Sequence, residues 1–129
     1  MFQMDYDVLS YFEKKIGEEI PIYNLIEYED ILKPEIENKI FYSLEENNVS
    51  AISIPNKNLQ LNIPEEIGLL HTLRVLNFQG NKISKLPYSL RNLFHLEILN
   101  LKDNDLDFLP AHSLKTLTLL RRRGYNVIK

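Results

Sequence analysis

The chain has 129 residues, which is enough for one domain with a continuous hydrophobic core. It contains no cysteine, so a disulfide framework, a thiol nucleophile and a thiolate metal site are excluded. Its net charge of −3 conceals an asymmetry: residues 1–48 hold 12 acidic and 4 basic residues, a net of −8, whereas residues 49–129 hold 6 acidic and 11 basic residues, a net of +5.

The distribution of apolar residues gives no sign of a membrane span. Each leucine-rich stretch is interrupted within a few residues by a charge or an asparagine. The first residues include Asp5, Asp7, Glu13, Lys14 and Lys15, a pattern that is not typical of a secretory signal. We therefore expect a cytoplasmic protein without a membrane partner.

The first element expected along the chain is an amphipathic helix over residues 5–16. Apolar residues recur there at helical spacing, and Gly17 is expected to end the helix. The apolar positions are Val8, Leu9, Phe12 and Ile16. Residues 20–31 alternate between apolar and acidic types and are rich in strand formers, so we expect extended chain.

A β-hairpin is expected next. Residues 40–44 read as a strand, and the polar run 45–48 turns the chain into a second strand that starts at Val49. This hairpin is expected to protect the edge of the segment that follows it.

Residues 73–83 and 96–106 share one pattern, L-x-x-L-x-L/F-x-x-N-x-L/I, at a spacing of 23 residues. A weaker copy starts 24 residues earlier, at Val49, with Lys57 where the others have asparagine, and includes Leu59. Alternation within each copy is typical of a strand with one buried face. The positions expected to point inward are Ile52, Ile54, Leu76, Phe78, Leu99 and Leu101.

The asparagines Asn81 and Asn104 follow two of these strands directly. An amide side chain at such a bend can bond main-chain groups that the turn would leave without partners. Lys57 cannot accept a hydrogen bond, so the first turn must be closed in another way. An inserted residue is placed at 60–62, where the first period is one residue longer.

The C-terminal residues depart from the period. Leu114, Leu117 and Leu120 recur at helical spacing, so a terminal helix is predicted over residues 113–123, with Ser113 as its N-cap and Gly124 as its stop. Residues 125–128 are then expected to return as a short strand beside residues 96–101.

Fixed-period repetition predicts an α/β solenoid, in which each unit buries its apolar face against its neighbours. The spacers agree as well, since the Leu-Pro pair at 86–87 corresponds to the Ile-Pro pair at 63–64. With its L-P-x-x-L-x-x-L-x-x-L spacer, the sequence resembles the leucine-rich repeat family in its 23-residue form, and is similar to short intracellular members from prokaryotes, archaea in particular. In that comparison residues 31–39, which contain Pro34, look like an insertion.

The resemblance implies a right-handed superhelix with a parallel sheet on its concave face. An N-terminal cap of helix and hairpin would span residues 1–48, the repeats residues 49–110 and a helical C-terminal cap residues 111–129, all within one domain. In this family the solvent-facing strand positions commonly contact a partner. The positions that match here are Arg74, Val75, Asn77, Gln79, Glu97, Ile98, Asn100 and Lys102.

These positions combine polar groups with an apolar strip formed by Ala51, Val75 and Ile98. Ordinary strand packing explains the strip; alternatively, it is a binding stripe flanked by Asn77 and Asn100, whose amides fix a bound backbone. We expect a noncatalytic protein–protein interaction module or scaffold that uses this face. A face only about 15 to 20 Å across is small beside the roughly 800 Å² per partner of a standard interface.

Other functions remain open at this point. The chain could be an adaptor or regulator of a small GTPase or another signalling enzyme, which similarity to Ras-suppressor-type repeats suggests by analogy. The charge asymmetry allows weak head-to-tail self-association in a structural role. Three adjacent arginines, 121–123, cannot all face one ligand from a helix, so no nucleic-acid partner is expected.

The sequence gives little support for an enzyme, a metal or a cofactor. Neither His71 nor His95, which occupy equivalent spacer positions, nor His112 has a paired carboxylate or cysteine arranged near it in sequence. The acids Asp103, Asp105 and Asp107 lack the glycine and terminal glutamate of a calcium loop. The four glycines are widely separated, so there is no phosphate-binding loop.

Overall fold

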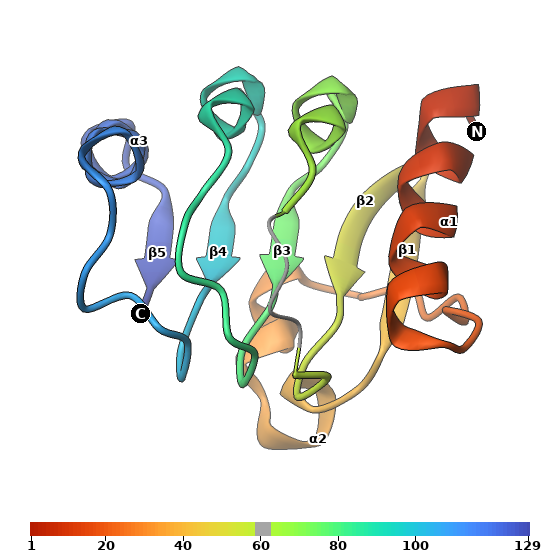
Figure 1. Cartoon of the computed structure of the whole chain (residues 1–129). Helices are drawn as coiled ribbons and strands as arrows, with labels where there is room; N and C mark the ends of the chain where they lie inside the picture. Colours follow the sequence, from red (N-terminus) through yellow and green to blue (C-terminus); the bar gives the residue numbers. More distant parts are fainter. Residues whose placement is uncertain (59–62) are drawn as a thin grey trace.

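Five strands form one open sheet, in the order β1-β2-β3-β4-β5. The computed structural model describes residues 1–58 and 63–129, so the predicted Leu59 and the predicted insertion at 60–62 lie outside the described residues. Strand β1 pairs antiparallel with β2, and every later pairing is parallel (Figure 1). The strands are β1 (Phe41–Glu45), β2 (Asn48–Ser53), β3 (Val75–Asn77), β4 (Ile98–Asn100) and β5 (Asn126–Ile128).

Helical segments pack on both faces of this sheet. The longer helices are α1 (Gln3–Ile16) and α3 (Ala111–Arg122), and α2 (Pro34–Glu37) is a single turn. Three 3₁₀ turns are η1 (Tyr28–Leu32), η2 (Glu65–Leu69) and η3 (Tyr88–Asn92). Elements α1, η2, η3 and α3 contribute to the larger hydrophobic cluster, whereas η1 and α2 contribute to a separate cluster on the opposite face.

The predicted fold class, a right-handed superhelical solenoid with a parallel sheet, is wrong. The structure is a small α/β fold with one mixed, open five-stranded sheet. The physical reason lies in the non-repeating N-terminal third: it supplies the antiparallel strand β1 and also sends a segment across the sheet face that a solenoid would leave open. Only β3 and β4 are spaced by the 23-residue period, too few units for a superhelix.

The predicted inward positions of the strands are confirmed. Ile52, Leu76 and Leu99 align across β2, β3 and β4 and are fully buried in the larger cluster. Phe12 of α1 packs its ring against Phe78, with 5.5 Å between the ring centroids. The larger core is therefore continuous from the N-terminal helix to the last parallel strands.

Each predicted turn asparagine bonds the main chain of two neighbouring layers. The Nδ2 of Asn81 donates to the carbonyls of Ile54 at 2.8 Å and Phe78 at 3.0 Å. Asn104 does the same one layer on, toward Phe78 at 2.8 Å and Leu101 at 3.0 Å. The first turn carries Lys57 instead of asparagine. It is held by a side chain of the next layer, since the main-chain N–H of Lys57 donates to Oδ1 of Asn81.

The chain ends match the expectations with one correction. Helix α1 ends at Gly17, which has a left-handed φ of 74°, and β5 pairs with β4. Helix α3 begins two residues before Ser113, after Pro110, so the predicted N-cap is wrong. Ser113 is fully buried, and its hydroxyl instead accepts from the N–H of Leu86 at 2.9 Å.

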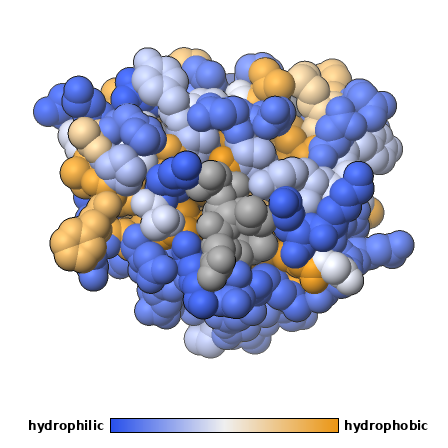
Figure 2. Space-filling model, viewed as in Figure 1, coloured by the Kyte–Doolittle hydropathy of each residue, from blue (hydrophilic) through white to orange (hydrophobic). Residues whose placement is uncertain are grey.

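Hydrophilic residues cover most of the face seen in Figure 2, and the apolar patches between them are small and separate. Within residues 1–58 and 63–129, no helix combines the length and the apolar character needed to cross a bilayer.

Leu99→Ala is expected to lower the free energy of unfolding by about 2 to 5 kcal/mol, because it opens a cavity at a fully buried position between neighbouring strands. Urea titration followed by circular dichroism measures this change. Leu114→Ala, at a half-exposed position of α3, is the control and should alter the free energy by less than about 0.5 kcal/mol. A loss below about 1 kcal/mol for Leu99→Ala would contradict the register.

Candidate functional site

The second hydrophobic cluster lies on the sheet face opposite the larger core. Residues Ile31 and Ile36 pack there over Ala51, Val75 and Ile98, one from each of the three central strands. We call residues 26–40 the strap, and the sheet face beneath it the strap face. Figure 1 shows the strap passing behind the sheet. The apolar strip expected for a partner is thus covered by the chain itself.

Local sequence explains the path of the strap. A reciprocal capping box between Glu27 and Asp30 starts η1, and Pro34 opens α2 with a fixed φ in its first turn. Just before the strap, the N–H of Tyr23 donates to the carbonyl of Tyr42 in β1 at 2.9 Å. The strap returns directly into β1, so both of its ends are held at the same strand.

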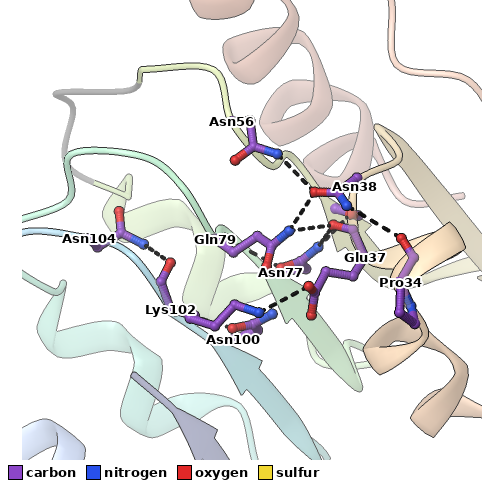
Figure 3. Close-up of polar contacts among 10 residues, drawn as sticks. Pro34, Glu37, Asn38, Asn56, Asn77, Gln79, Asn100, Lys102 and Asn104 are labelled. Atoms are coloured by element: carbon purple, nitrogen blue, oxygen red, sulfur yellow. Dashed lines mark hydrogen bonds and ion pairs between the residues drawn. The ribbon is translucent and has the colours of Figure 1, made fainter.

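Side chains of the strap face bind the main chain of the strap. The Nδ2 of Asn77 donates to the carbonyl of Glu37 at 2.9 Å, and Nε2 of Gln79 donates to the same carbonyl at 3.1 Å (Figure 3). The hydroxyl of Ser53 donates to the carbonyl of Lys39 at 2.7 Å. Asn77 and Asn100 were expected to fix the backbone of a partner; in the structure, the amide of Asn77 instead holds a carbonyl of the same chain, and the binding of a partner stays a prediction.

Charge complements these contacts. The strap holds five acidic residues and two lysines, a net charge of −3. Its Glu37 forms an ion pair with Lys102 at 3.0 Å, and the guanidinium of Arg74 lies 5.7 Å from the ring centre of Tyr28. Glu18 and Lys57 form a further pair at 2.7 Å. Part of the opposite charge of the two chain segments is therefore paired within one molecule.

Two buried polar atoms on the strap face have no hydrogen-bond partner among residues 1–58 and 63–129: Nδ2 of Asn100 and Oε1 of Gln79. Asn100 occupies the position in β4 that Asn77 occupies in β3. Its Oδ1 accepts from the N–H of Lys102 at 3.1 Å, just as Oδ1 of Asn77 accepts from the N–H of Gln79 at 3.3 Å. The two asparagines differ in the Nδ2, which meets a strap carbonyl only at Asn77.

The eight predicted contact residues fall into two groups. Val75, Asn77, Gln79, Ile98 and Asn100 are buried beneath or beside the strap. Arg74, Glu97 and Lys102 keep solvent-exposed side chains at the rim of the strap face, with Arg74 and Glu97 3.7 Å apart. With the strap in place, these three side chains are the members of the predicted set that a partner can still reach.

An open groove of about 420 Å³ adjoins the rim where β4 and β5 begin. Glu29 of the strap forms one side, and Arg74, Glu97, Phe94 and Tyr125 contribute to the rest. The ring of Phe94 is 66% exposed, which makes it an apolar contact point among charges. Sequence reasoning did not place this groove, because its walls come from segments far apart along the chain.

The sequence also did not predict that the strap covers one face of the sheet. The insertion at 31–39 was visible in the sequence, but its position over the strands was not. One signal pointed to it: two isoleucines flank Pro34 within an acidic segment, and apolar residues in such a segment need a surface on which to be buried.

The three histidines do not form a metal site among the described residues. His71, His95 and His112 are exposed, and no three His, Cys, Asp or Glu side chains of residues 1–58 and 63–129 are placed to hold a metal ion. No protein-family model matches the sequence.

Asn77→Ala is expected to lower the free energy of unfolding by about 1 to 3 kcal/mol, because the bonds from its Nδ2 to the carbonyl of Glu37 and to Oγ of Ser53 are both lost, although Gln79 still donates to that carbonyl. Asn100→Ala is the matched control, since it removes the same Oδ1 role but no bond to the strap, and should cost less than about 1 kcal/mol. Urea titration of both variants compares them. Equal losses would show that the bond to the strap contributes nothing.

Acidification is expected to loosen η1. The pKa of Asp30 is lowered from 3.8, mainly by its hydrogen bond to Lys33 and then by the N–H of Glu27. A carboxylate with a lowered pKa stabilises the fold above its ordinary pKa and loses that contribution as pH falls through the lowered value. NMR signals of Ile31 followed from pH 5 downward should report this step. An unchanged profile in Asp30→Asn would assign the step to other groups.

Proposed function

We propose that the protein is a noncatalytic protein-interaction module of the cytoplasm, related to the leucine-rich repeat family. One observation carries the proposal: side-chain amides and a hydroxyl on the strap face hold the carbonyls of a short chain segment. Groups that bind main-chain carbonyls suit recognition of a polypeptide. The kinship is supported by the 23-residue offset between β3 and β4 and by the asparagine at each following turn.

The rim and the groove are the surfaces that a partner meets first. They combine the exposed ring of Phe94 with charges of both signs from Arg74 and Glu97. Exposed charges at a rim steer association and select among partners more than they add affinity. Tight binding needs roughly 800 Å² on each partner, so a strong complex must also use the strap or the face below it.

A double variant, Arg74→Ala with Glu97→Ala, tests the rim. It removes a weak, exposed ion pair and leaves the hydrogen bonds between the strap and the sheet intact, so the fold should be kept. Affinity capture from extract of the native cell, read by mass spectrometry, should recover a partner with wild type and at least about tenfold less with the variant.

Lys82→Ala with Lys85→Ala is the matched control for this capture. Both lysines are exposed and lie in the turn that follows β3, away from the groove. This variant should recover the partner as wild type does. Equal recovery by all three proteins would argue against the rim as the contact surface.

A further inference from the structure

We propose that the strap is an intramolecular occupant of a binding site for an acidic segment of a partner protein, and that the partner displaces it. This inference rests on the proposed function and adds the chemistry of the partner and the state of the site. The strap face takes a segment that carries two aliphatic side chains within a run of acidic residues, as the strap itself does.

The strap can leave without opening the main core. Apart from Ile40 at its C-terminal end, which packs against the larger cluster, its apolar contacts belong to a separate hydrophobic cluster. The segment before it is bonded to β1 through Tyr23, and Phe41 continues it as the first residue of β1. Detachment therefore exposes the strap face while the sheet, α1 and the outer helices keep their packing.

The charges identify the kind of segment that replaces the strap. Glu37 pairs with Lys102, and a second cation, Arg74, stands at the same rim near Tyr28. A neutral or basic segment would leave Lys102 without its partner. A competing acidic segment keeps that pair, so its binding should weaken as salt is added.

The strap fits the face incompletely, which favours exchange. Ser53 and Asn77 each donate to a strap carbonyl, whereas Asn100, one strand further along, is 1% exposed and its Nδ2 meets no acceptor in the part of the chain that the structure describes. A partner segment that reaches β4 supplies the missing carbonyl. It thereby gains a hydrogen bond that the strap lacks. This bond offsets part of the high effective concentration that the strap has because it belongs to the same chain.

A peptide of residues 26–40, added in trans, tests the proposal. Ile31→Asp places a charge in the buried strap cluster and should release the strap, and Ile36→Ala is a milder second variant. Ile26→Asp is the matched control, because Ile26 belongs to the strap but is 90% exposed. Unchanged amide signals of Leu76 and Leu99 verify that the main core stays folded.

Binding is followed through the side-chain amide signals of Asn77 and Gln79, which contact the strap carbonyl. The peptide should bind the Ile31 and Ile36 variants at least about tenfold more tightly than wild type or Ile26→Asp, because the tethered strap competes in the latter two. A peptide with its glutamates changed to lysine should bind at least about tenfold more weakly to the released variants.

Three results would overturn the inference. The peptide fails to bind either released variant although the main core is intact; the lysine peptide binds as well as the acidic one; or sedimentation shows that wild type exchanges straps between two copies, which would assign the face to a second copy. If the rim variant still loses its partner in capture while the peptide fails, the interaction module stands and only the strap proposal falls.

Discussion

Strands β3 and β4 contain three residues each, so their place in the sheet depends on pairing at both edges and on side chains buried in the larger core, and the strap adds burial on the other face. The structure meets this constraint completely. Their inward side chains fill the larger core, their opposite side chains lie under the strap, and each strand is bonded to a neighbour on either side. The turn asparagines hold adjacent layers at one offset. Without the strap, Val75 and Ile98 would be an exposed apolar strip on very short strands.

The sequence allowed the larger core and the order of elements to be predicted, because their signals are local and periodic. Alternation placed Leu76 and Leu99 correctly, Gly17 ended the first helix as expected, and the polar run at 45–48 turned the hairpin. Ser113 misled, since a serine ahead of a leucine run has the pattern of an N-cap while its hydroxyl is needed by the main chain of Leu86. Whether Ser113 caps the helix or binds Leu86 depends on a contact between residues 27 positions apart, which the local sequence does not show.

The fold class and the covering of the candidate site by the strap could not be predicted from local patterns, because both depend on contacts between distant segments of the chain. A period of 23 residues shows which side chains point away from the core, but not what covers them. The cover comes from a non-repeating segment whose contacts with Asn77 and Lys102 span 40 and 65 residues of sequence. Resemblance to a known family favoured an open face, so the sequence placed Asn77 on this face but gave no sign that a segment of the same chain covers it.

The strap has a fixed reach, whereas the sheet ends at an edge strand, β5, whose outer side pairs with no other described strand. An additional 23-residue unit placed between β4 and α3 would extend the sheet by one strand and leave the strap and its anchors on β1 unchanged. The polar column of Ser53, Asn77 and Asn100 would then continue onto uncovered surface. Lengthening the chain in this way would leave part of the strap face always uncovered. The number of repeat units therefore sets how much of this face the strap can cover.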